Sequence, residues 1–203
     1  LVDPVISATA QQISCIGASD GEILVSITPA TNGFGPYTYE LYENNGGTQG
    51  ALITSQVDNP LFTGLSFDAN PAPYPIAGEY LVVVRSSFGC EGQVPVTLVN
   101  PTDPTANLSS TAYSCTGMAE NFPVITVSGF SGGTGTGYRL SYTDPSGNVF
   151  GPSNITSFDT DGVTPGIQII ADEAGNYTFT IYDSNNCSNV IAPINIPVFP
   201  IMT

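Results

Sequence analysis

Alternation of hydrophobic and polar residues is the main structural signal in this chain. In residues 177–182, Tyr177, Phe179 and Ile181 fall on one face of a strand of period two, and the residues between them fall on the other. Residues 80–85 repeat the pattern, with Tyr80, Val82 and Val84 set against Leu81, Val83 and Arg85. We therefore expect two equivalent strands, each with one face in a core and the other in water.

These two segments belong to two copies of a longer pattern. Residues 77–90 and 174–187 align without a gap, at the constant offset of 97 residues that separates Cys90 from Cys187. A domain of about 100 residues can bury its own core. We therefore predict two tandem domains, residues 1–100 and 101–203, joined by a semi-rigid spacer around Pro101 and Pro104.

Short alternating runs separated by turn residues continue along both copies, and no segment has a helical period. In the first copy the expected strands are residues 5–13, 22–28, 37–41, 51–56, 61–65, 80–85 and 94–98. In the second they are residues 123–128, 138–142, 167–170, 177–182 and 190–198. This spacing predicts an all-β fold of two tandem immunoglobulin-like β-sandwich domains.

The charge of the chain excludes two classes of partner. The formal net charge is -15, because 17 acidic residues face only two basic ones, Arg85 and Arg139, and there is no histidine. Two arginines cannot neutralise a phosphate backbone or an anionic bilayer, so we expect no nucleic acid partner and no membrane insertion. No apolar run reaches the roughly 18 residues of a membrane span, and the N-terminus does not resemble a signal peptide, so we expect a piece of a longer exported protein.

Four cysteines, two in each copy, indicate disulfides and an oxidising compartment. The simplest pairing is Cys15 with Cys90 and Cys115 with Cys187, which closes a long loop in each copy. In a strict immunoglobulin topology, however, the two cysteines of one copy lie at opposite ends of the sandwich, farther apart than a disulfide allows. Pairing of Cys15 with Cys187, or free thiols, are the alternatives.

Spaced motifs of the first copy resemble a known family. They are Cys15-x-Gly17-x-x-Asp20-Gly21-x-Ile23, Gly35-Pro36-Tyr37-Thr38-Tyr39, Leu65, Ala77-Gly78-x-Tyr80-x-Val82-x-Val84 and Gly89-Cys90. This set resembles the SprB-type repeat of the large gliding-motility adhesins of Bacteroidota, and the second copy is a diverged version of it. The resemblance implies a surface-exposed protein, exported by type IX secretion, whose partners are neighbouring repeats of the same chain.

Few residues suggest a chemical site. Adjacent acids such as Asp172 and Glu173 are most simply solvated, and without histidine there is no base for a nucleophile, so we expect no enzymatic activity. Calcium is the one cofactor considered, with Asp159, Asp161 and Asp103 as candidate ligands, although no EF-hand spacing occurs.

Two tyrosines and the glycines before them have a structural interpretation. Tyr80 and Tyr177 follow Gly78 and Gly175 at the same spacing, which is similar to the tyrosine corner of immunoglobulin-like domains. Exposed tyrosines could instead form a sugar-binding face, and the candidates for that role are Tyr42, Tyr74 and Tyr182.

The leading hypothesis is a non-enzymatic, extracellular repeat segment of a cell-surface adhesin, which supplies length and presents a distal binding region. The alternative is a carbohydrate-binding or accessory module of a secreted enzyme, with surface polysaccharide as its partner. Selective binding of the fragment on a glycan array would favour the alternative.

Overall fold

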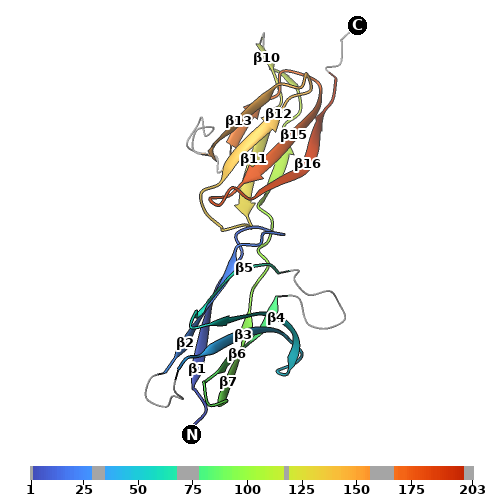
Figure 1. Cartoon of the computed structure of the whole chain (residues 1–203). Coiled ribbons are helices and arrows are strands. Elements are labelled where there is room, and N and C mark those ends of the chain that lie inside the picture. The colour runs from blue at the N-terminus through green and yellow to red at the C-terminus, as the bar shows by residue number, and fades with distance from the viewer. Residues whose placement is uncertain (1, 29–34, 68–77, 117–118, 156–166, 199–203) are drawn as a thin grey trace. The chain divides into compact units, whose positions relative to one another are not determined.

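The chain forms two compact units, Leu1–Pro101 and Thr102–Thr203. The computed structural model describes residues 2–28, 35–67, 78–116, 119–155 and 167–198 (Figure 1). The division falls inside the expected proline-containing spacer. In the described residues no helix is long or apolar enough to span a bilayer.

The first unit is a sandwich of two antiparallel sheets, ordered β1-β2-β5 and β4-β3-β6-β7. Neighbours in this order that are far apart in sequence, such as β2 and β5, make it an immunoglobulin-like arrangement and not a simple meander. The strands are β1 (Ile6–Gln11), β2 (Gly21–Ile27), β3 (Thr38–Asn44), β4 (Gln49–Val57), β5 (Leu61–Leu65), β6 (Glu79–Arg85) and β7 (Glu91–Thr97).

The second unit repeats this topology, with sheets β14-β11-β8 and β13-β12-β15-β16 and an added hairpin of β9 and β10 (Figure 1). Strand for strand, β8 corresponds to β1, β12 to β3 and β15 to β6. The strands are β8 (Thr105–Ser110), β9 (Ser114–Thr116), β10 (Ala119–Asn121), β11 (Val124–Ser131), β12 (Arg139–Thr143), β13 (Val149–Asn154), β14 (Ile167–Ile170), β15 (Gly175–Tyr182) and β16 (Ser188–Ile196). The all-β, tandem sandwich fold expected from the sequence is therefore confirmed.

Each unit has its own core between its two sheets. The predicted inward face of β15 is buried, since Tyr177, Phe179 and Ile181 pack against Ile125 and Val127 of the facing sheet. In the first unit the corresponding side chains of β6 pack with residues of β2, β3 and β5. Period-two alternation in the central strand therefore specifies which face of each four-stranded sheet is covered.

The outer face of β6 differs from the sequence expectation. Leu81 and Val83 were expected to be in water, but both are buried. They lie opposite Tyr42 and Glu40 of β3 in the strand register, and the long side chains of these neighbours cover them. The equivalent residues of β15 are threonines, which leave the same face of the second unit more open.

Gly78 fixes the entry of the chain into β6. Its φ of 79° lies in the left-handed region, and a Cβ there would lie 2.3 Å from the carbonyl oxygen of Leu98 and 2.7 Å from the ring of Phe67. Both the backbone conformation and the packing therefore require glycine. Gly175, with a φ of 135°, has the same double requirement, because a Cβ would lie 2.8 Å from Pro145.

Alanine at Gly78 should destabilise the first unit more than alanine at Gly89. Gly89 has a similar φ of 80° but no atom within 4 Å of the added Cβ, so Gly89→Ala reports the conformational cost alone, about 1–2 kcal/mol. Gly78→Ala adds steric overlap worth a further ~1–3 kcal/mol. Urea unfolding of both variants measures the difference, and equal losses would contradict the packing role of Gly78.

Candidate functional site

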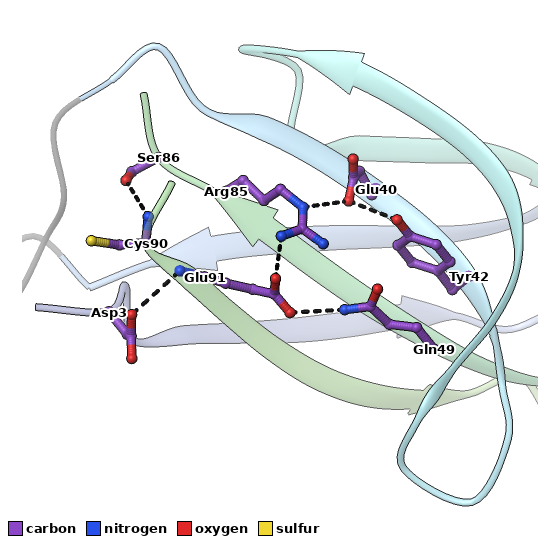
Figure 2. A network of polar contacts seen from close by, with 8 residues as sticks. All are labelled: Asp3, Glu40, Tyr42, Gln49, Arg85, Ser86, Cys90 and Glu91. Atoms are coloured by element: carbon purple, nitrogen blue, oxygen red, sulfur yellow. Dashed lines mark hydrogen bonds and ion pairs between the residues drawn. The ribbon is translucent and has the colours of Figure 1, made fainter. Parts of the chain in front are cut away.

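A polar network covers the outer face of the four-stranded sheet in the first unit (Figure 2). We call Glu40, Tyr42, Gln49, Arg85 and Glu91 the Arg85 cluster. Arg85 Nε donates to Glu40 at 2.9 Å, and Arg85 Nη1 donates to Glu91. Tyr42 donates its hydroxyl to Glu40 at 2.9 Å, and Gln49 donates its amide to Glu91 at 2.8 Å. The cluster thus joins four neighbouring strands, β4, β3, β6 and β7.

The Arg85 cluster holds two carboxylates against one guanidinium, so its positive charge is fully neutralised within the cluster. The side chains of Arg85, Glu40 and Glu91 are 36%, 15% and 31% exposed. The hydrogen bond to Glu40 raises the pKa of Arg85 further, and burial raises that of Tyr42. Ion pairs with this much exposure contribute about 1 kcal/mol at most. With two carboxylates against one guanidinium, the cluster has no positive charge left for an anionic ligand. Its members Tyr42 and Glu40 lie opposite the buried Leu81 and Val83 in the strand register.

The second unit has its own arginine on the corresponding sheet. The guanidinium carbon of Arg139 lies 5.5 Å from the ring centroid of Tyr182, within the range of a cation–π contact. Its Nη2 donates to Oδ1 of Asn186. We call Arg139, Tyr182 and Asn186 the Arg139 cluster. Of the three tyrosines considered for a sugar-binding face, Tyr182 and Tyr42 each belong to one of these clusters, while Tyr74 lies outside the described residues.

In both units, a side-chain oxygen of the residue that follows the central strand accepts backbone N–H bonds and holds the turn after it. In the second unit Asp183 is fully buried, and its Oδ1 accepts backbone N–H bonds from Asn185 and Cys187, both at 2.9 Å. Its Oδ2 accepts from the backbone of Thr134 at 2.9 Å. In the first unit Ser86 holds the equivalent turn by accepting from the N–H of Cys90 at 3.2 Å. Asp183 thus has a structural role in this turn.

Of the three calcium candidates, the structure describes Asp103 alone. Asp159 and Asp161 lie outside the described residues. Asp103 is exposed, and within the described ranges no group of three or more acids or cysteines could hold a metal ion. Calcium binding therefore stays a prediction.

Both corner tyrosines are buried and bonded to the backbone. Tyr80 donates its hydroxyl to the carbonyl of Ser66 at 2.5 Å. Tyr177 donates to the carbonyl of Glu173 at 3.3 Å and accepts from the N–H of the same residue. These contacts fasten the loop before each central strand to the strand itself, which is the structural role expected of a tyrosine corner.

The residues of the Cys-x-Gly-x-x-Asp-Gly motif shape the turn between β1 and β2. Gly17 has a φ of 76°, and Asp20 accepts the N–H of Ser14 at 2.9 Å. Hydrogen bonding to the side chain of Ser14, and then to its backbone, lowers the pKa of Asp20. At Gly21 a Cβ would lie 2.8 Å from Leu98 and 2.9 Å from the carbonyl of Leu65. The motif is therefore a folding signature and not a ligand site.

The cysteines depart from the simplest pairing. Cys15 and Cys187 each take part in a disulfide, whereas Cys90 is a free thiol, so the expected Cys15–Cys90 bridge is wrong. The physical reason is distance. Cys90 lies at the start of β7, where the N–H of Glu91 donates to Asp3, whereas Cys15 lies beyond the far end of the six-residue β1. That strand separates them by about 20 Å, while a disulfide needs Cα atoms within about 7 Å. The side chain of Cys115 lies outside the described residues.

Alkylation of the unreduced protein should distinguish the cysteines. Iodoacetamide should label Cys90 without reduction, and Cys15 and Cys187 only after reduction. Mass spectrometry of the peptides measures this, with urea-unfolded, unreduced protein as the control for accessibility. Labelling of Cys15 in that control would contradict its bonded state, and mapping of the unreduced peptides identifies the partner of each bonded cysteine.

The corner tyrosines should make the protein sensitive to alkali. Burial raises the pKa of Tyr80 and of Tyr177 above the ordinary value of about 10. The unfolded chain then ionises first, so the stability is fully present below pH 10 and is lost as pH rises through the higher folded pKa.

Tyr80→Phe tests this dependence. At pH 7 the variant should lose about 1 kcal/mol with its hydrogen bond. Its free energy of unfolding in urea should then fall less steeply above pH 10 than that of the unmodified protein. An equal slope would mean that Tyr80 contributes nothing to the alkaline loss.

Comparison with known proteins agrees with the sandwich fold. The chain is similar to the three N-terminal domains of the Highly Immunogenic Outer Capsid protein (Hoc) of bacteriophage RB49, with a TM-score of 0.53 and 11% identity over 97% of this chain. It covers 59% of that chain, and at this identity the likeness shows the fold alone. A segment of two fibronectin type III domains from chicken tenascin is also similar, at 14% identity over 95% of this chain and 99% of that one, with a TM-score of 0.32.

The sequence comparisons are more specific. No curated protein matches the chain. The family model of the SprB repeat matches residues 7–46, a range that runs from β1 into the turn after β3. The first unit therefore contains an SprB-type repeat segment, as the resemblance of its sequence predicted.

Proposed function

We propose that the chain is a non-enzymatic, extracellular repeat segment of a large cell-surface adhesin, in which sandwich units in series supply length and take part in adhesion. The observation that carries this proposal is the match of residues 7–46 to the SprB repeat, because SprB repeats belong to surface-exposed proteins. We further propose that it is exported by type IX secretion and acts in gliding motility.

The construction of the units supports this role. Each unit has its own core and the same strand order, so each is a self-contained module that can be repeated along a chain. The motif residues Gly17, Asp20 and Gly21 serve the turn and not a ligand, as expected of a module repeated for its shape. The disulfide-bonded cysteines suit an oxidising compartment.

The functional groups also favour a non-enzymatic role. The chain has no histidine, and the buried carboxylate of Asp183 accepts three backbone N–H bonds. The carboxylates of Glu40 and Glu91 are bonded to Arg85. These acids are held in structural contacts, which suits a module that binds or spaces and does not transform a substrate.

Antibodies against this fragment should label intact cells that express the parent protein, and external protease should remove the label. An epitope tag distal to the segment should become less accessible when residues 1–203 are deleted. Two unrelated fibronectin-type domains inserted in their place should restore access, since the role proposed is length. Labelling only after permeabilisation would overturn the surface location. Release of the fragment into the medium with a covalently linked enzyme domain would favour an accessory module instead.

A further inference from the structure

The two arginines of the protein occupy the same corner of the same sheet in their respective units. In the first unit Arg85 of β6 lies opposite Thr38 of β3, and in the second Tyr182 of β15 lies opposite Arg139 of β12. β6 corresponds to β15 and β3 to β12. The arginine therefore lies at the same corner of the sheet in both units, but on the central strand in the first and on the neighbouring strand in the second.

The acidic partners have not been kept. The position of Glu40 on β3 corresponds to Ser141 on β12, as each lies two residues after the corner residue on the same face. The position of Glu91, opposite Arg85, corresponds to Ser188, opposite Tyr182. Both carboxylates that neutralise Arg85 are therefore replaced by serine. Within the described part of the chain, both ion pairs belong to Arg85 and no carboxylate contacts Arg139.

The guanidinium of Arg139 is held in place without being neutralised. Tyr182 lies against it, and Asn186 accepts one of its N–H bonds. A guanidinium has five donors in a fixed planar fork that matches a carboxylate, and fixing the fork beforehand lowers the cost of binding one. The Arg139 cluster is thus a cation already oriented for an anion.

Several hydroxyl side chains lie on the same face as this cation, together with Asn154 opposite Arg139 on β13 and the exposed Val190 opposite Thr180 on β16. On the face of β15 that carries Tyr182, the alternating residues are Thr178 and Thr180, with Ser141 beside Thr180 on β12 and Ser188 on β16. Thr178 and Ser188 are exposed and Thr180 is half-buried, whereas Ser141 is buried. Uncharged hydroxyls both donate and accept, which suits a ligand that is itself rich in hydroxyls.

We propose that the Arg139 cluster, with the hydroxyl row of Thr180 and Ser188, binds a uronic acid residue of an acidic polysaccharide. The carboxylate of the sugar meets Arg139 and the sugar hydroxyls meet the row. The net charge of -15 opposes the binding of any polyanion as a whole, so we expect the site to take a single carboxylate of the sugar chain at Arg139. The site does not depend on the proposed surface role, since it can be tested on the isolated protein.

Isothermal titration calorimetry of the 203-residue protein with tetragalacturonate at low salt should show saturable binding. The carboxyl-reduced tetrasaccharide should bind at least about tenfold more weakly, because the charge-assisted bonds are lost. Arg139→Gln should weaken tetragalacturonate binding by a similar factor, whereas the matched variant Arg85→Gln should bind like the unmodified protein.

A second variant keeps the test independent of any loss of folding in Arg139→Gln. Ser141→Glu places a carboxylate where Glu40 stands in the first unit, so it should neutralise Arg139 and abolish binding, while circular dichroism confirms that the sheets are intact. The proposal is overturned if the unmodified protein shows no saturable binding, if the reduced sugar binds equally well, or if Arg139→Gln or a folded Ser141→Glu protein binds as before. Binding of oligoglutamate in preference to tetragalacturonate would also overturn the saccharide assignment.

Discussion

The fold of each unit depends on one central strand, β6 or β15, whose alternate residues must all lie in the core. Tyr177, Phe179 and Ile181 are essentially inaccessible to water, and side chains of this size each contribute about 1.5–3 kcal/mol when buried. A slip of one residue would turn this whole set outward, so the register to both neighbouring strands is fixed by the same burial. The glycine and the corner tyrosine at the start of the strand fix the conformation of the chain where the strand begins, and this also secures the register.

Strands with a clear hydrophobic pattern of their own were predictable from sequence, whereas strands that form only through pairing with a neighbouring strand were not. The predicted residues 61–65 and 167–170 coincide with β5 and β14. By contrast β13 was not expected, because Gly151-Pro152 suggests a turn and the exposed Val149 and Phe150 give no alternation. It is an edge strand that exists through its pairing with β12. The burial of Leu81 and Val83 was missed for a similar reason, since the side chains that cover them come from another strand.

The candidate sites show the same limit. The family motif and the corner tyrosines could be located from spacing, because spacing along one chain defines a turn. The Arg85 and Arg139 clusters could not, since each joins residues 45 or more positions apart and requires the register between strands. The predicted bridge from Cys15 to Cys90 is wrong because it rests on the length of the loop that it would close, whereas the length of β1 holds these two cysteines apart.

The turn after the central strand and the outer face of the four-stranded sheet are made by residues other than those that form the core. This separation has an evolutionary consequence. Ser86 and Asp183 hold the same turn with different chemistry, and the outer face exchanges Glu40 and Glu91 for Ser141 and Ser188 while the inward residues keep the sandwich intact. A gene that duplicates such a module can therefore alter what one copy displays without first compensating for a loss of folding. Successive copies in one chain are then free to become chemically distinct surfaces on a common scaffold.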